Sequence, residues 1–331
     1  MAPSRTPSEA RRRCVGAVRV VLLLLLAGGV GAADDGWQSP LGRAHPLTGR
    51  IWDTARGAFI ETAGLVEQLG RARFVLLGER HDNADHHRLQ AELLRALVAR
   101  GRRPAVAFEM FTTDDGPGIA RQLAAAPRDA DALADAVDWK RSGWPSWSMY
   151  RPIVQTALEA SLPIVAANLS ATLTQSLSSG GPAALPATTA KQLGLDAPLP
   201  PDVQGAVAAE LRRAHCGRGS DATIERMALI QRGRDAQMAL SLAGADGGDG
   251  AVLITGAGHA RVDWGVPMHL RGRRPDATTV SLGFVEVSDA GTEPAAYATA
   301  SGGSGLPFDY VWFTPRVDAP DPCRDRARPP G

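Results

Sequence analysis

The sequence predicts an α/β protein with a mostly parallel central sheet, flanked by helices, and a helical lobe or lid. Short apolar runs alternate with segments in which apolar residues recur at helical spacing, and this alternation is typical of parallel strands joined by crossover helices. The apolar runs also end abruptly in polar residues, as strands of an open parallel sheet do beside a ligand-binding crevice. The expected strands comprise residues 73–78, 105–108, 163–167, 251–255, 280–287 and 310–313.

The first 33 residues have the pattern of a secretory signal peptide. A basic region precedes an apolar run over 20–27, and small residues follow through Ala33. The run is too short to span a membrane. We therefore expect removal of 1–33, export to the periplasm or cell envelope, and no transmembrane segment in the mature chain. Cys14 precedes the apolar run and no cysteine directly follows it, so we expect no lipid anchor.

The composition and length of the remaining chain limit its possible partners and its number of domains. The full chain has 36 basic and 35 acidic residues, and without the five Arg and one Glu of 1–33 it keeps 31 and 34. This balance argues against a nucleic-acid partner. The length suits one α/β domain over 34–323, with a helical lobe formed by about 112–150 and 170–243 and a polar tail over 324–331.

The densest chemistry follows the first strand of the expected parallel sheet. Residues 79–87 hold Glu79, His81 and five other charged or imidazole side chains, after which leucines recur at helical spacing. Asp82, Asn83 or Asp85 can cap that helix. A turn at the carboxyl end of a parallel strand is where ligands bind, although a solvated loop with a capping network would have the same composition.

The other elements follow in order. Residues 51–60 suggest a hairpin, and residues 61–70 suggest a helix that ends at Gly70. Glu109 and Asn168 each follow an apolar strand, which places both near the same crevice. Residues 170–201 have few apolar anchors and indicate a mobile or loosely helical excursion, whereas 202–243 are helical by period. Residues 280–287 and 310–313 supply the last strands, which we expect at an edge of the sheet.

A Gly-x-x-His pattern occurs twice, each time directly after an apolar strand: Gly78 to His81 and Gly256 to His259. Glycine permits a sharp turn and a close approach to a ligand. We therefore expect the side chains that follow the strands to line one pocket. The pocket and catalytic candidates are Glu79, His81, Glu109, Asn168, His259 and Arg261, and the candidates for a divalent metal are His81, His259, Glu79 and Glu109.

Four large aromatic residues lie within a dozen positions: Trp139, Trp144, Trp147 and Tyr150. Aromatic residues at this density either anchor the core of a helical lobe or line a flat apolar ligand site. Two cysteines remain after residue 33, Cys216 and Cys323. They would form a disulfide in an oxidising compartment only if the fold brings them together, which the sequence leaves open.

Together these motifs resemble a known family. The segments LLGERHDNADHHRLQ, AFEMF, IVAANLS, AHCG, RDAQMA, ITGAGHARVDWGVPMHL and FDYVWFTPRVDAPDPC are similar to the haem-binding uptake proteins of the ChaN type, a family grouped with the Tiki proteins and erythromycin esterases. The resemblance implies an envelope protein that binds haem for iron uptake and forms haem-bridged dimers. Known members are described as lipoproteins, and the absence of a lipidation cysteine here departs from that pattern.

Two functions are therefore open. A binding protein would hold haem against Trp144 and Trp147, with Tyr150 or a pocket histidine as the iron ligand and His215 as the second choice, because haem iron accepts Tyr and His. A hydrolase would use His81, His259, Glu79 and Glu109 to bind a metal that activates water, or as general base and electrostatic support. The export signal and the aromatic cluster favour binding, so we expect a binding protein rather than an enzyme.

Overall fold

The computed structural model describes residues 36–289, 291–300, 305–318 and 323. The expected signal segment 1–33 and the polar tail 324–331 lie outside the described residues. From Trp37 onward the described chain belongs to one compact unit. None of the described helices is both long enough and apolar enough to cross a membrane.

An eight-stranded sheet forms the centre of the unit, with the strand order β2-β1-β8-β7-β3-β6-β4-β5. The strands from β3 to β8 are parallel to one another, and β1 pairs antiparallel with both β8 and β2. The predicted α/β class is therefore confirmed. The strands are β1 (Ile51–Asp53), β2 (Ala58–Ile60), β3 (Phe74–Glu79), β4 (Ala105–Thr112), β5 (Ile164–Asn168), β6 (Ala251–Gly256), β7 (Thr279–Glu286) and β8 (Tyr310–Thr314).

The expected edge position of the last two strands is wrong. β7 pairs with β3, and β8 lies between β7 and β1. The hairpin of β1 and β2 covers β8, so β2 and β5 form the two edges of the sheet. An antiparallel hairpin can add to a parallel sheet without a crossover, which is why the short N-terminal strands occupy the outer position.

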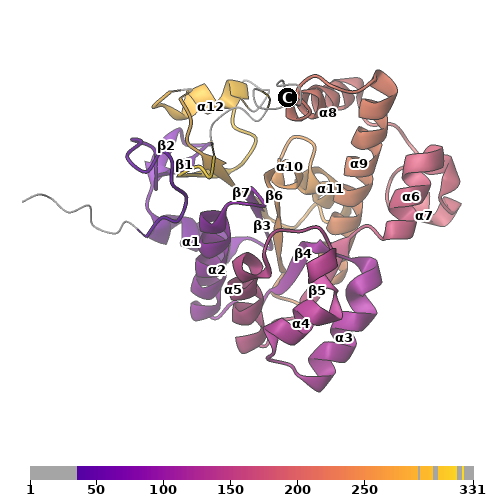
Figure 1. The fold of residues 1–331 in the computed structure, drawn as a ribbon, viewed down its shortest axis with the longest axis horizontal. Helices are drawn as coiled ribbons and strands as arrows, with labels where there is room; N and C mark the ends of the chain where they lie inside the picture. The colour runs from indigo at the N-terminus through magenta and orange to yellow at the C-terminus, as the bar shows by residue number, and fades with distance from the viewer. Residues whose placement is uncertain (1–35, 290, 301–304, 319–322, 324–331) are drawn as a thin grey trace, which may run out of the picture. The chain divides into compact units, whose positions relative to one another are not determined.

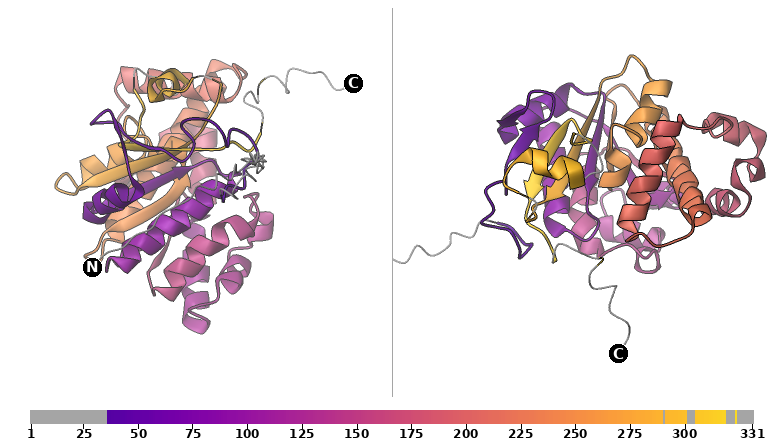
Figure 2. Two further views of the ribbon diagram at one scale, coloured as in Figure 1. Left: turned by 90° about the vertical axis from the view of Figure 1, so that its left-hand side faces the viewer. Right: turned by 90° about the horizontal axis from the view of Figure 1, so that it is seen from above.

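Each face of the sheet packs on its own layer of helices (Figures 1 and 2). Val75 and Leu77 of β3 belong to one core cluster, whereas Phe74 and Leu76 belong to the other. This alternation explains the continuous apolar sequence, because a parallel strand between two helical layers is buried on both faces.

The first layer includes α1 (Thr62–Arg71), α2 (Ala84–Ala99), α3 (Gly116–Ala125), α4 (Ala130–Ala136) and α5 (Trp147–Glu159), with the short helices η1 (Thr113–Asp115) and η2 (Trp139–Arg141). Their buried side chains are continuous with the core of the sheet, so residues 112–150 pack as part of this layer. The second layer includes α9 (Asp221–Gly244), α10 (Ala257–Ala260), α11 (Val266–Arg273) and α12 (Pro294–Ala300).

The region expected to be mobile or loosely helical is folded into helices. It contains α6 (Ala171–Gly180), η3 (Gly181–Ala184) and α7 (Ala187–Gln192), and α8 (Pro201–Ala214) follows. Leu177, Leu193 and Leu195 form a small apolar cluster with Ala236 of α9. These few leucines suffice to anchor the segment because α9 supplies the other half of the cluster.

Candidate functional site

The predicted polar residues meet at the carboxyl ends of four neighbouring strands, β3, β6, β4 and β5. Glu79 is the last residue of β3, and Asn168 is the last residue of β5. Glu109 lies in β4, and His259 lies in α10, directly after β6. The parallel topology therefore places side chains from distant parts of the sequence at one edge of the sheet.

The glycines of the two Gly-x-x-His motifs are needed for close packing. A Cβ atom at Gly78 would lie 2.7 Å from the Cβ atom of Ala260 in α10, and a Cβ atom at Gly256 would lie 3.0 Å from the His81 ring. Neither glycine has a positive φ angle. The absence of a side chain at each glycine leaves room for residues in or next to the other motif. The glycines therefore serve close packing and not the sharp turn toward a ligand that was expected.

Glu109 is the centre of the buried cluster. One carboxylate oxygen accepts hydrogen bonds from the backbone N–H of Gly256 at 2.7 Å and the hydroxyl of Thr255 at 2.8 Å. The other lies 3.0 Å from Arg234 Nη2 and 3.1 Å from His259 Nε2. Burial alone would raise the pKa of Glu109, but His259 and Arg234 hold that pKa well below its usual range. Glu109 is therefore an ionised carboxylate inside the protein.

His259 lies between two buried carboxylates. Its Nδ1 is 2.6 Å from Asp235 Oδ1, and its Nε2 faces Glu109. Burial alone would lower the pKa of His259, but Glu109 and Asp235 raise it to about 9. Burial raises the pKa of Asp235 to about 6, against the opposing effect of His259. His259 is thus held as an imidazolium at neutral pH, and this suits electrostatic support better than proton abstraction.

His81 lies on the exposed side of the cluster. Its Nδ1 is 2.7 Å from Glu79 Oε1, and its side chain is 38% exposed whereas that of Glu79 is fully buried. Its ring contacts Trp144 edge to face, with 4.9 Å between the centroids. Burial lowers the pKa of His81, but Glu79 and Glu109 outweigh that effect and raise it. A buried carboxylate therefore orients a half-exposed imidazole beside an aromatic ring.

Tyr150, the first choice of haem ligand from the sequence, lies in the core beside Glu79. It is fully buried, its hydroxyl donates to Glu79 at 3.3 Å, and its ring packs against His87 and Trp139. Burial and the neighbouring Glu79 raise the pKa of Tyr150 far above its usual value, which opposes formation of a phenolate. Tyr150 is thus a core residue that helps hold Glu79, while Trp144 and Trp147 are partly exposed.

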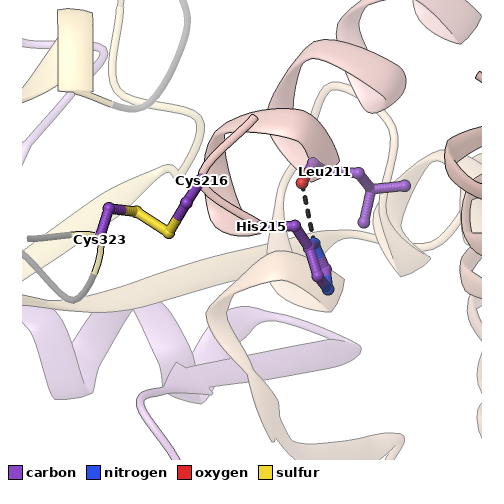
Figure 3. The surroundings of a disulfide bond; sticks show 4 residues. All are labelled: Leu211, His215, Cys216 and Cys323. Atoms are coloured by element: carbon purple, nitrogen blue, oxygen red, sulfur yellow. Dashed lines mark hydrogen bonds between the residues drawn. A yellow bond between two sulfur atoms is a disulfide. The ribbon is translucent and has the colours of Figure 1, made fainter. Parts of the chain in front are cut away.

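The two remaining candidates, His215 and Arg261, have partners outside the contacts described above. His215 caps the end of α8, where its Nδ1 bonds to the Leu211 carbonyl at 2.9 Å. Figure 3 shows this ring next to the disulfide between Cys216 and Cys323, whose Cα atoms are 5.4 Å apart. Arg261 pairs with Asp263 at 2.7 Å and lines a cavity of about 380 Å³ together with Arg80 and Gly258 of the two Gly-x-x-His motifs.

The candidate metal ligands do not form a metal site in the described part of the chain, where no group of three or more His, Cys, Asp or Glu side chains has suitable geometry. Both ring nitrogens of His259 face carboxylates, and Glu109 is already engaged by four donors. A metal ligand must offer a free lone pair. The divalent-metal prediction is therefore unsupported by the residues that the structure brings together.

Three residues of α9 that complete the cluster were not predicted from the sequence. Arg234 and Asp235 contact Glu109 and His259, and Gln231 lies 2.9 Å from His259 Nδ1 through its side-chain amide. The feature of the sequence that could have indicated them is the charged pair Arg234 and Asp235 in the middle of a predicted helix with apolar residues nearby. Positions 231, 234 and 235 share one helical face with the buried Met238, because residues three and four apart are neighbours on a helix.

The histidine-rich turn after β3 is held in place by hydrogen bonds of its own side chains. Asn83 is the residue that caps α2, through hydrogen bonds from the backbone of Asp85 and His86. His86 bonds to Thr314 at 2.8 Å, and His87 bonds to the carbonyl of His81 at 3.0 Å. Both rings are fully buried. These side chains therefore hold the turn in place, and only His81 of the three histidines faces outward.

Comparisons with known proteins agree with this architecture. The solved structure of the ChaN protein of Campylobacter jejuni, described with cofacial heme binding, aligns with a TM-score of 0.62 at 20% identity and covers 79% of this chain and 95% of that chain. The type III effector HopBA1 aligns with a TM-score of 0.41 at 14% identity, covering 86% of this chain and 100% of that chain. An erythromycin esterase mutant in its open conformation gives 0.39 at 17% identity, covering 69% and 72%. At scores this low, neither of the last two bears on the fold.

A search of the curated proteins finds no match. Residues 65–270 match the family described as haem-binding uptake, Tiki superfamily, ChaN. This match spans more than half of the sequence, and the chain therefore belongs to the ChaN family of haem-binding uptake proteins.

Proposed function

We propose that the protein binds haem as a cargo on the side of the cluster where His81 and Trp144 are exposed. The single observation that carries this placement is the contact between His81 Nδ1 and the buried Glu79. Histidines that bind metals usually donate their other ring N–H to a carboxylate, which fixes the tautomer. A proton on Nδ1 leaves the lone pair on Nε2 as the donor for the iron.

The aromatic residues around His81 fit the flat part of the ligand. Trp144 contacts the imidazole edge to face, and Trp147 is also partly exposed. Haem needs an axial donor for its iron and apolar contact for its macrocycle. His81 and Trp144 offer both in adjacent positions, whereas the buried Tyr150 offers neither without repacking the core.

The expected export is consistent with the Cys216–Cys323 disulfide, because such bonds persist in oxidising compartments such as the periplasm. We infer a periplasmic role in haem or iron uptake, after loss of residues 1–33. The Campylobacter jejuni relative is described with cofacial heme binding, and we propose the same arrangement for this chain. Two copies of this chain would bring two haem groups face to face and form a haem-bridged dimer.

Hemin titration tests the assignment. We expect wild-type protein to shift the Soret band at a stoichiometric ratio, and His81→Ala to weaken binding at least tenfold and change the spectrum. His215→Ala is the matched control, because His215 is a partly exposed histidine on another element. Equal hemin binding by His81→Ala and wild type would exclude His81 as the ligand. Sedimentation with and without hemin tests the dimer, which should appear only with hemin.

Hydrolysis is a second proposal, because a carboxylate that orients a half-exposed imidazole is also the arrangement of a general base. Glu79 and His81 would fill these roles, with the His259 imidazolium as electrostatic support. Turnover of p-nitrophenyl esters that is lost in both His81→Ala and Glu79→Gln would support it. Turnover that survives His81→Ala would assign the activity to a contaminant or another site.

A further inference from the structure

A cavity of about 510 Å³ lies between α8 and α9, on the side of the cluster that Asp235 faces. Figures 1 and 2 show these two helices side by side. The cavity exists because Gly205 and Ala208 of α8 and Ala228 of α9 are small where the helices meet. Leu229 and Val207 supply apolar walls. Cavities of this size commonly hold small organic ligands.

Three polar atoms of the lining residues are buried and, within the described part of the chain, have no hydrogen-bond partner: Asp235 Oδ2, Trp264 Nε1 and Arg232 Nε. Asp235 is 1% exposed and Trp264 is 5% exposed. A buried polar group without a partner costs about 1–3 kcal/mol, so such groups are rarely left unpaired without a reason. All three belong to residues that line this cavity, and a ligand that supplied one donor and two acceptors would satisfy them.

The cavity is distinct from the proposed haem site. Among the described residues that line it, none is a His, Tyr, Cys or Met, the side chains that ligate haem iron. It adjoins the cluster from the α9 side through Asp235 and Gln231, which contact His259. His81 and Trp144 belong to other elements, at the end of β3 and before α5.

We propose that this cavity binds a small amphipathic acid whose apolar body lies between α8 and α9. The acid group accepts hydrogen bonds from Trp264 Nε1 and Arg232 Nε, and a separate N–H or O–H group of the ligand donates to Asp235 Oδ2. The other charged residues that line the cavity are Arg212, which pairs with Asp221 at 2.6 Å, and Glu225. The site goes beyond haem binding and does not depend on it.

A disulfide restrains the connection between the two helices that line the cavity. Cys216 lies in the connection between α8 and α9, and a disulfide joins it to Cys323 (Figure 3). Restricting the connection reduces the freedom of α8 to move away from α9. A restrained connection lowers the entropic cost of ordering these two helices around a ligand.

Indole-3-propionate is a suitable probe, because it combines a carboxylate, an apolar bicycle and an N–H donor. Indole lacks the carboxylate, and 1-naphthaleneacetate lacks the N–H donor. We expect calorimetry to show indole-3-propionate binding at least tenfold more tightly than either. The Trp264→Phe variant, which loses only the indole N–H donor and a small part of the ring volume, should weaken indole-3-propionate at least fivefold and leave indole within twofold.

Cavity-filling variants provide the controls. Ala228→Phe should reduce indole-3-propionate binding more than tenfold, whereas Ala206→Phe adds the same side chain at an exposed position of α8 outside the cavity and should stay within twofold of wild type. Gly205→Leu is a second filling variant in case Ala228→Phe unfolds, since no atom lies within 4 Å of a Cβ at Gly205. The ligand should also shift the indole N–H resonance of Trp264.

The proposal is overturned if both filling variants bind the probe as well as wild type does, or if the three probes bind equally. It is also overturned if the Trp264 resonance does not move at saturation. Hemin-loaded protein should bind indole-3-propionate with unchanged affinity. Displacement of the probe by hemin would mean that the cavity belongs to the haem site, which would exclude a separate ligand.

Discussion

Replacing Glu109 by Gln should destabilise the protein strongly, because Glu109 is the ionised centre of the buried cluster. Four donors face its two oxygens: Gly256 N, Thr255 Oγ1, Arg234 Nη2 and the imidazolium of His259. Glutamine has only one acceptor oxygen, so its NH2 group must face one of the two pairs of donors. The variant therefore loses two hydrogen bonds and leaves the buried His259 imidazolium and the partly exposed Arg234 with less negative charge beside them.

The expected loss is about 3 kcal/mol in the free energy of unfolding, at the low end of the cost of breaking a buried ion pair. With a urea dependence of about 3 kcal/mol per molar for a chain of this size, the unfolding midpoint should fall by about 1 M. The matched control is Glu159→Gln, which changes the same group on the exposed side of α5 and should shift the midpoint by less than about 0.2 M.

A second measurement separates the charge effect from a packing effect. The imidazole pKa of His259, followed by NMR, should fall from about 9 in the Glu109→Gln variant, because Glu109 is one of the two carboxylates that raise it. A midpoint shift no larger than that of the control, or a pKa that stays at its wild-type value, would refute the description of Glu109 as the ionised centre.

Three further predictions follow from the same contacts. Gly256→Ala should weaken hemin binding several-fold, since its Cβ would lie 3.0 Å from an imidazole ring, while Gly70→Ala, which meets nothing within 4 Å, should have no effect. Tyr150→Phe should leave the hemin spectrum unchanged. The lost hydrogen bond to Glu79 should cost about 1 kcal/mol in the free energy of unfolding. Altered charge-transfer bands would instead identify Tyr150 as a ligand of the iron. The folded-state pKa of His259, about 9, exceeds its usual 6.5, so its stabilisation is complete below about pH 6.5 and is lost as the pH rises through 9. The urea midpoint of unfolding should therefore decrease as the pH rises from 7 to 9.5. A smaller decrease in His259→Gln would confirm that His259 is the source of this pH dependence.

Local patterns in the sequence were sufficient to predict the strands and the edge of the sheet where the site lies. Apolar runs buried on two faces have a distinctive composition, and the polar residues that end them must meet when the strands are parallel. Glu79, Glu109, Asn168 and His259 were predicted together on this basis, and the structure brings them together. The hairpin over 51–60 and the helix after it were also predicted from local residues alone.

Features that depend on which distant elements pack together were not predictable in the same way. The N-terminal hairpin takes the place beside β8, so the last strands are internal. Arg234 and Asp235 reach the site only because α9 packs against β4, β5 and β6. Tyr150 is buried behind Glu79 because α5 packs against α2. The pairing of Cys216 with Cys323 spans 107 residues.

The sequence by itself therefore determined the elements, the fold class and the edge of the sheet that carries the chemistry, because these follow from the burial pattern of each segment. Only the tertiary structure decided which side chains are exposed and which protonation states they hold. His81 and His259 occur in the same motif, yet one is half-exposed beside a single carboxylate and the other is buried between two. Burial and charged neighbours set a pKa, and both arise from residues far away in the chain.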